Sequence, residues 1–352
     1  MSIVRPLAIR ALTLAGVFFA VLFLLVVTLG ATGFSDRMLG AVVNEQLRVE
    51  RTALAETIRD PDELERVLEA RRETLRSFYG LDTPWYFRLP QTVLRVLTLD
   101  LGEARTLRSF RGSSRVADIV LERLPNTIVL LTTALIITAA IGLVVGVNMA
   151  VRPGSRIDRL VSAFAAVSFA LPTWWMGILL ILILSVHFRL LPSGGMYSAP
   201  PPVGTISRFL DLLWHAVLPV LTLVLVSVGP YIYVVRTITL NVAQEDHVAL
   251  ARAKGLPESR VMYRHILRVA APPIVTGLIL GLAGSLSGSI LVETVFNWQG
   301  MGRLYYEAVV GTPDESVIVS LTFLFTLLYV VARFILEVLY VLLDPRVRYT
   351  ER

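Results

Sequence analysis

Six long apolar runs limit what this chain can fold into. They cover residues 8–30, 126–150, 160–188, 215–239, 273–296 and 317–343. A helix that crosses the hydrocarbon core of a bilayer needs about 20 mostly apolar residues, and each run is long enough. Hydrophobic residues make up 55% of the 352-residue chain, which is above the usual share in a soluble domain. The sequence therefore predicts an all-α integral membrane protein with six transmembrane helices.

Arginines in the connecting loops predict the orientation. The loop after the second run carries Arg152, Arg156 and Arg159, whereas each short loop expected on the other side carries one or two arginines. Basic residues gather in cytoplasmic loops. We therefore predict that both termini are cytoplasmic and that the long polar segment 34–122 lies outside. Such loops explain the net charge of +6 better than a nucleic-acid partner does.

This topology divides the chain into four parts. Residues 1–33 form an N-terminal anchor helix, whose apolar core is longer than that of a cleaved signal peptide. Residues 34–122 form an extracytoplasmic helical segment. Residues 123–345 form a core with five transmembrane helices and a cytoplasmic loop at 245–270, and residues 346–352 form a cytoplasmic tail.

Within the outer segment, DPDELERVLEARRETLRSFYG carries the signals of a helix. Asp60 is the predicted N-cap, and Pro61 is the first helical residue. Glu63 is placed to return a capping bond, and Gly80 marks the end. One face carries an apolar stripe: Leu64, Val67, Leu68, Leu75 and Phe78. Two interpretations stay open, a helix that packs on its neighbours outside the membrane and a docking surface for a partner.

The motifs of several enzyme classes are absent from the sequence. An ATPase of the phosphate-loop type needs G-x-x-x-x-G-K-[ST], but the only lysine, Lys254, stands in ARAKGL, which lacks that spacing. The four histidines show no H-E-x-x-H spacing, no G-x-S-x-G nucleophile motif occurs, and there is no cysteine. We therefore expect no catalytic residues, no metal site and no cofactor in this chain.

Ionisable residues in the apolar runs raise one alternative, an ion-coupled carrier or an exporter subunit. Such carriers keep charged groups at mid-membrane, and the candidates are Glu293, Arg333 and Glu337. Arg333 and Glu337 are spaced i, i+4, so they can instead pair with each other on one helix face. Arg236, near the inner end of run 215–239, can extend to the interface.

Four glycines recur in the run 273–296. They are Gly277, Gly281, Gly284 and Gly288, and their spacing places them on one helix face. Small residues allow close approach of helices in lipid. A face of small residues can equally line a passage for a bulky solute, and both interpretations stay open.

A charged stretch, VALARAKGLPESRVMYRHIL at 248–267, interrupts the apolar second half of the chain. Gly255 can adopt a positive φ and end one short helix, and Pro257 can start a second. Glu258 favours the positive end of that second helix. Small alanines before Gly255 and arginines at helical spacing after it suit contact with another protein. The pattern predicts two short helices that form a cytoplasmic docking element.

The longer stretch ALARAKGLPESRVMYRHILRVAAPPI resembles the coupling loop of ATP-binding-cassette importer permeases, often written E-A-A-x-x-x-G-x(9)-I-x-L-P. Aligned on Gly255, Ala251 is the second alanine of that loop and Leu250 replaces the first. Ala249 stands where glutamate is typical, and Pro273 best matches the closing proline. These departures are common in one branch of the family, the dipeptide/oligopeptide permeases.

Further motifs extend the resemblance to that branch over residues 80–349. In order they are YGLDTPWYFR, LTLDLGEA, ERLPNTIVL, FALPTWWMGILLI, LPSGG, HAVLPVLTL, VETVFNWQGMGRL and DPRVRY. They are similar to the first of two permease subunits, the dipeptide permease B type. The outer segment at 34–78 is longer than this resemblance implies.

The resemblance implies a type I ABC importer permease fold in a prokaryotic cytoplasmic (inner) membrane. Its implied partners are a second permease, two ATP-binding subunits that hold ATP and Mg, an extracytoplasmic solute-binding protein and membrane lipid. The cargo would be short peptides, or else oligosaccharides, glutathione or nickel chelates. The implied ATPase-coupling residues are Ala249, Leu250, Ala251, Ala253, Lys254, Gly255, Glu258, Arg260 and Arg264.

Two further sets of residues are candidates. The four glycines and Glu293 would line the translocation path. Trp298 and Arg303 follow run 273–296, where they could contact solute or the binding protein at the outer face. An interfacial tryptophan belt would explain Trp298 as well.

Overall fold

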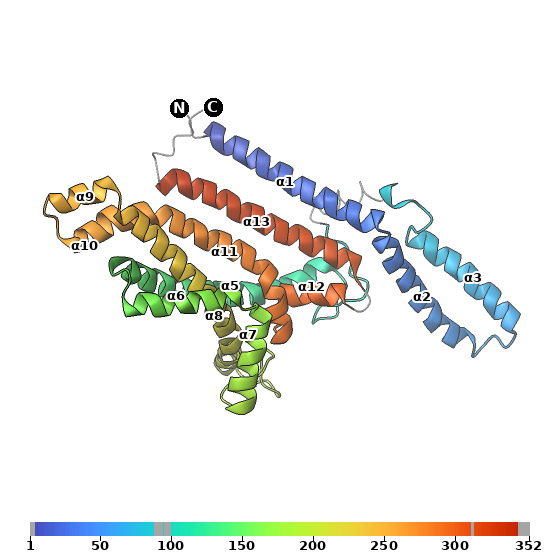
Figure 1. Cartoon of the computed structure of the whole chain (residues 1–352). Helices are drawn as coiled ribbons and strands as arrows, with labels where there is room; N and C mark the ends of the chain where they lie inside the picture. Colours follow the sequence, from blue (N-terminus) through green and yellow to red (C-terminus); the bar gives the residue numbers. More distant parts are fainter. Residues whose placement is uncertain (1–3, 88–93, 95–99, 311–312, 344–352) are drawn as a thin grey trace. The chain divides into compact units, whose positions relative to one another are not determined.

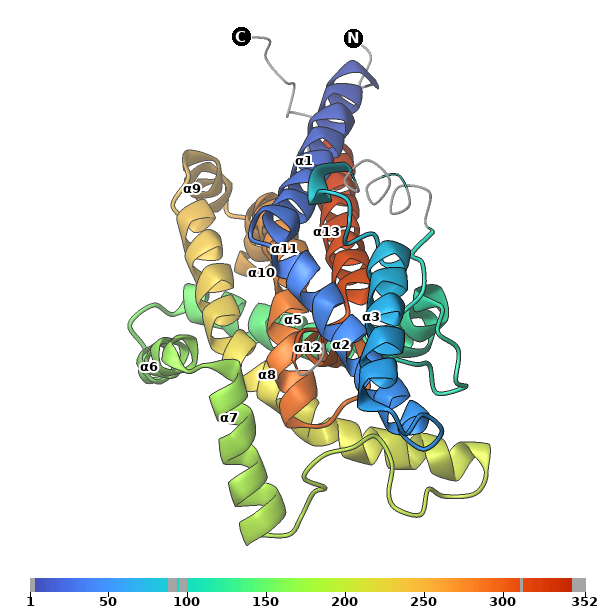
Figure 2. The same ribbon diagram turned by 90° about the vertical axis from the view of Figure 1, so that its right-hand side faces the viewer.

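The computed structural model describes residues 4–87, 94, 100–310 and 313–343. In these residues the regular structure is helical, apart from an isolated bridge between Glu103 and Arg115. The helices are α1 (Val4–Ala31), α2 (Phe34–Leu54), α3 (Pro61–Phe78), α5 (Val116–Val151), α6 (Arg156–Ala170), α7 (Thr173–Leu180), the π-helical η1 (Ile181–His187), α8 (Thr205–Ala243), α9 (Asp246–Ala253), α10 (Glu258–Arg260), the π-helical η2 (Val261–Ile266), α11 (Leu267–Val295), α12 (Met301–Val309) and α13 (Glu315–Leu343) (Figures 1 and 2). The predicted all-α class is confirmed. The predicted tail at 346–352 lies outside the described residues.

Among the described residues, four helices are long and apolar enough to cross a membrane. They cover Ala8–Leu25, Val116–Val151, Thr205–Ala243 and Ser316–Val338. The bent pair formed by Arg156–Ala170 and Thr173–His187 adds a fifth span if the two parts are counted as one. Helix α11 covers most of the fifth predicted span, 273–296, but it is not among the helices that pass this test of length and apolarity. The structure therefore supports a multi-pass membrane protein with four to five spans.

The predicted span 160–188 is not one helix. The chain breaks between α6 and α7, and the two parts are bent by 104°. Pro172 lacks an N–H group and disfavours helical ψ in the residue before it, and Leu171 is extended with a ψ of 124°. The expectation of a continuous span through Pro172 was therefore wrong.

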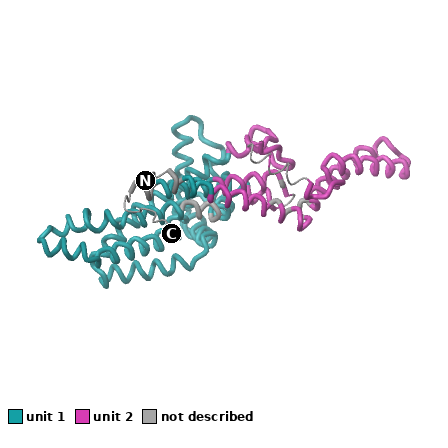
Figure 3. The backbone as a smooth tube through the Cα atoms, turned by 90° about the horizontal axis from the view of Figure 1, so that it is seen from above, with its two compact units in different colours: residues 1–12, 123–304, 328–352 teal, residues 13–122, 305–327 magenta. Residues whose placement is uncertain are grey.

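The chain forms two compact units, each built from separate stretches. One unit combines residues 1–12, 123–304 and 328–352, and the other combines 13–122 and 305–327 (Figure 3). In the first unit α8 is central, because α6, α7 and α11 all pack against it. Its core consists of apolar side chains from these helices and from α5, including Leu130, Leu218, Val224, Val228 and Phe296.

Helices α5 and α8 approach closely at two glycines of α5. A Cβ on Gly142 would collide with the ring of Tyr231, and one on Gly146 would lie 2.9 Å from the carbonyl oxygen of Ile232. The spacing is G-x-x-x-G, the pattern that lets membrane helices meet backbone to backbone. Gly229 of α8 allows an equally close approach to α6, because a Cβ on Gly229 would lie 2.7 Å from Ala165 Cα.

In the second unit, α2 and α3 form an antiparallel hairpin (Figures 1 and 2). The predicted α3 is confirmed, and Asp60 caps it by accepting a hydrogen bond from the Asp62 N–H at 3.0 Å. Leu68 and Leu75 pack against Val43 and Leu47 of α2, a helix that we did not predict. Val67 and Phe78 were assigned to the same stripe, but they are exposed.

Candidate functional site

Of the two short helices predicted for the cytoplasmic docking element around Gly255, the first is the separate helix α9, and the second, α10, is the start of a longer helix. Helix α8 ends at Ala243, α9 follows after a two-residue turn, and α10 continues through η2 into α11 (Figures 1 and 2). Gly255 has a φ of +74°, and its N–H donates to the Arg252 carbonyl at 2.9 Å. Such a left-handed residue is the usual end of a helix. Pro257 is the N-cap of α10, with a ψ of 140°.

The inner side of this element packs on its own chain. Val248, Ala251, Val261 and Ile266 are buried in a cluster with side chains of α8 and α11. Ala251 is only 4% exposed, so its small size serves packing on the element's own helices. The expectation that Ala251 presents itself to a partner was therefore wrong. The apolar residues after Gly255, Val261 and Ile266, are likewise buried against the chain's own helices.

The outer side of the element is available for a partner. Leu250 is 57% exposed, so this side of the element carries a large apolar side chain at its surface. The other exposed residues of the predicted coupling set are Ala249, Ala253, Lys254, Gly255, Glu258, Arg260 and Arg264. An apolar centre with basic surroundings can fit a cleft that carries acidic groups.

An ion pair crosses the bend at Gly255. Arg252 Nη2 lies 2.6 Å from Glu258 Oε1, and both side chains are about half exposed. The hydrogen bond from Arg252 lowers the pKa of Glu258 below its ordinary value of 4.5. A carboxylate with a lowered pKa stabilises the fold above its unfolded pKa and loses this contribution as the pH falls through its folded pKa. The pair therefore persists at neutral pH.

The glycines of α11 do not mediate close packing within the chain. No atom lies within 4 Å of a Cβ built on Gly277 or Gly281. The surroundings of the Gly284 and Gly288 positions lie outside the described side chains. Of the two interpretations, close packing inside this chain was therefore wrong for the first two glycines. That the four glycines line a passage stays a prediction.

Glu293, near the end of α11, is completely buried. Its Oε1 accepts a hydrogen bond from Thr127 Oγ1 at 2.8 Å, and its Oε2 accepts one from the Arg303 N–H at 3.0 Å. Thr127 Oγ1 also accepts from the Met301 N–H at 2.7 Å. The carboxylate thus joins α5 to the turn between α11 and α12. It does not face an open passage, so the structure corrects its assignment to the translocation path.

Trp298 lies in the same turn and is also completely buried. Its indole N–H donates to the Asn126 carbonyl at 3.1 Å, and its ring belongs to the core around α8. Neither contact with solute nor a place in an interfacial belt fits a fully buried ring, so both interpretations were wrong. Arg303 is partly buried, and its proposed contact at the outer face stays a prediction.

Two ion pairs hold charged groups of the apolar helices. The predicted pair between Arg333 and Glu337 is confirmed, with 3.7 Å between Nη2 and Oε1. Arg236 of α8 does not extend to the interface, because its Nε and Nη2 contact the two carboxylate oxygens of Asp158 at 2.6 and 2.9 Å. Asp158 also accepts the Gly154 N–H at 2.7 Å, so it binds the loop before α6 to α8.

Comparisons with known proteins show the family to which this chain belongs. The family model described as "Binding-protein-dependent transport system inner membrane component" matches residues 141–349. The oligopeptide transport system permease protein AppB of Bacillus subtilis is 31% identical over 284 residues, which cover 81% of this chain and 87% of AppB. The dipeptide transport system permease protein DppB of Escherichia coli K12 is 30% identical over 296 residues, with 79% and 86% covered.

A solved structure supports the same fold. A chain of the MetNI methionine ABC transporter, in an inward-facing conformation, superposes with a TM-score of 0.53 at 18% identity, covering 66% of this chain and 99% of that one. Together with the family match, this likeness shows the type I ABC importer permease fold. The chain therefore belongs to the inner membrane components of binding-protein-dependent transport systems, and it is a permease subunit of an ABC importer, a transport protein and not an enzyme.

Proposed function

We propose that this chain forms half of a translocation pathway for short peptides. The observation that carries the proposal is the similarity, along about four fifths of the chain, to permeases named for oligopeptide and dipeptide transport. The other half would be a second, homologous permease. Two cytoplasmic subunits would bind ATP and Mg, and a solute-binding protein would deliver the peptide from outside.

The outer side of the α9–α10 element is the proposed contact with an ATPase subunit. Leu250 would enter an apolar cleft on that subunit, and Lys254, Arg260 and Arg264 would meet acidic groups around it. Closure of the ATPase pair on ATP would then push the element. Because α10 and η2 continue without interruption into α11, this push would reach the membrane helices.

A transport assay tests the choice of cargo. The complete transporter, with both permeases, both ATPases and the binding protein, would be expressed in cells that lack other peptide importers. We expect uptake of a radiolabelled alanine dipeptide that stops when the ATP-binding lysine of the ATPases is replaced and persists when the ion gradient is collapsed. Uptake of a nickel chelate or an oligosaccharide by the same cells, without peptide uptake, would reject the peptide cargo.

We further propose six transmembrane helices with both termini in the cytoplasm, in a prokaryotic cytoplasmic membrane. Helix α11 would be the additional span beside the four apolar helices and the bent pair α6–α7. The arginine-rich loop between α5 and α6 supports this orientation.

Cysteine labelling tests the orientation cleanly, since the chain has no cysteine. Arg152→Cys is suitable because Arg152 is exposed, whereas Ser155 caps α6 through the Asp158 N–H at 3.1 Å. A membrane-impermeant maleimide should label Arg152→Cys only after the cells are opened. The matched outer position, Glu56→Cys, should react in intact cells. Labelling of Arg152→Cys from outside would invert the proposed topology.

A further inference from the structure

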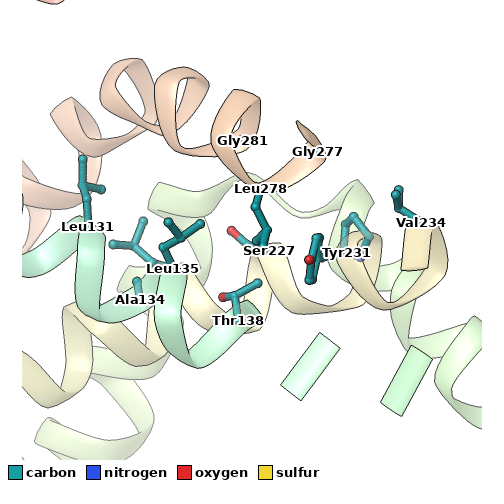
Figure 4. Close-up of a pocket in the computed structure, with 12 residues that line it drawn as sticks. Leu131, Ala134, Leu135, Thr138, Ser227, Tyr231, Val234, Gly277, Leu278 and Gly281 are labelled. Atoms are coloured by element: carbon teal, nitrogen blue, oxygen red, sulfur yellow. The ribbon is translucent and has the colours of Figure 1, made fainter. Parts of the chain in front are cut away.

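An open pocket lies between α5, α8 and α11 in the first unit (Figure 4). Its volume is about 310 Å³. Apolar side chains such as Leu131, Leu135 and Leu223 line one part of it. Gly277 and Gly281 of α11 line the opposite wall, where the absence of side chains leaves the space open. The pocket therefore depends on two glycines that no packing within the chain requires.

Three hydroxyl groups are the polar part of this lining. They belong to Thr138 of α5 and to Ser227 and Tyr231 of α8 (Figure 4). No carboxylate, amine or guanidinium is among the lining residues. A solute group held here would therefore be neutral. A few hydroxyls on an apolar wall are typical of ligand sites in proteins.

Tyr231 supplies the observation that points to a ligand. The residue is 9% exposed, and its hydroxyl is buried without a hydrogen-bond partner in the part of the chain that the structure describes. The ring lies against Gly142, where a Cβ would collide with it, so the side chain is held in place. Burying a hydroxyl without a partner costs free energy, and a ligand with a donor or acceptor would remove that cost.

The size and chemistry of the pocket select among possible occupants. A lipid acyl chain fills apolar space but offers no partner to Tyr231. A volume of about 310 Å³ is at the lower end of ligand sites, enough for one or two residues and too small for a helix of another subunit. A short peptide offers both an apolar side chain and amide groups. A neutral site would also release its solute readily, as a passage requires.

We propose that this pocket is a transit site for short peptides, in which an apolar side chain of the solute lies between the leucines and Gly277 and Gly281, and a peptide amide binds the Tyr231 hydroxyl. The inference rests on the proposed peptide function and adds a preference among peptides. Peptides with a large apolar residue would gain most from the pocket. Peptides of glycine or alanine would leave it mostly empty.

Filling the pocket tests the preference. Gly281→Leu adds a side chain where nothing lies within 4 Å, so the helix itself should tolerate it. In the complete transporter, we expect uptake of a leucine–phenylalanine dipeptide to fall about tenfold, while uptake of a glycine dipeptide changes less than about twofold. Gly16→Leu is the matched control, because Gly16 also lies in an apolar helix with nothing within 4 Å. That control should import both dipeptides normally.

A second variant examines the hydroxyl alone. Tyr231→Phe keeps the ring against Gly142 and removes one hydrogen-bonding group. We expect a dipeptide with a photoreactive benzoylphenylalanine to crosslink to the lining of the pocket in the unaltered transporter. The yield should fall about fivefold in Tyr231→Phe, as expected for the loss of one hydrogen bond, and further in Gly281→Leu.

The possible outcomes separate this inference from the proposed function. If the unaltered transporter imports both dipeptides and Gly281→Leu slows them equally, the transit site is refuted and the peptide function stands. If Gly281→Leu releases the second permease during purification, the pocket seats part of that subunit and the inference is wrong. If the unaltered transporter imports neither dipeptide, the peptide function fails, and the inference fails with it.

Discussion

Replacing Gly255 with valine is expected to abolish solute uptake without preventing membrane insertion. Gly255 has a φ of +74°, where a residue with a Cβ costs about 1–2 kcal/mol and a β-branched one more. The strain falls on the bend that sets the angle between α9 and α10. No atom lies within 4 Å of a Cβ at this position, so the effect would come from the backbone and not from a collision inside the chain. Uptake and co-purification of the ATPase subunits are the measurements.

Two control variants make this result specific. Gly255→Asn should keep most of the uptake, because asparagine tolerates the left-handed region far better than valine does. Glu258→Gln removes the ion pair with Arg252, and exposed pairs of this kind contribute about 0–1 kcal/mol, so transport should change little. Normal uptake by Gly255→Val would mean that the α9–α10 element only connects two helices, and the coupling proposal would have to be abandoned.

The second large effect is expected at the pair of Asp158 and Arg236. Both groups are mostly buried, and two hydrogen bonds join them. Removing one partner leaves the other charge buried and uncompensated, which costs about 3–5 kcal/mol. We therefore expect Asp158→Asn and Arg236→Gln each to lower the temperature at which the detergent-solubilised protein unfolds, and to reduce its yield in the membrane.

A double variant separates the pair from its surroundings. If the cost comes from the unpaired charge, Asp158→Asn with Arg236→Gln together should destabilise much less than the sum of the two single changes. Arg152→Gln, an exposed arginine in the same loop, is the control and should leave the unfolding temperature unchanged. Additive effects in the double variant would show that the two side chains act independently.

Local rules explain what could be predicted from the sequence. Gly255 and Pro257 determine the bend and the start of the second short helix through their own backbone preferences, and Asp60 and Pro61 do the same for α3. Long apolar runs predicted most of the membrane helices, because the bilayer imposes their length. Motif order along the chain predicted the family. None of these features depends on knowing which residues meet in space.

Features that depend on distant partners were not predicted. Asp158 and Arg236 are 78 residues apart, and an arginine near a helix end looks the same whether it meets lipid or a carboxylate. Trp298 follows an apolar run as interfacial tryptophans do, and only its bond to Asn126, 172 residues away, shows that it is buried. Gly142 and Gly146 have the same four-residue spacing as Gly277 and Gly281, so the sequence does not distinguish glycines that contact another helix from glycines that leave a space.

The two prolines of α11 have a mechanical consequence. Pro272 and Pro273 lack N–H groups, so two carbonyls of the preceding turn lose their helical partners, and the helix can swing there. Glu293 ties the far end to Thr127, whereas η2 joins the near end to the docking element. Gly281 lies twelve residues before Glu293, or about 18 Å along the axis at about 1.5 Å per residue. With the Glu293 end fixed, a tilt of about 6° would therefore move the glycine wall by about 2 Å, the van der Waals radius of a methyl group. A small movement of the docking element would then be enough to narrow the pocket around a peptide side chain.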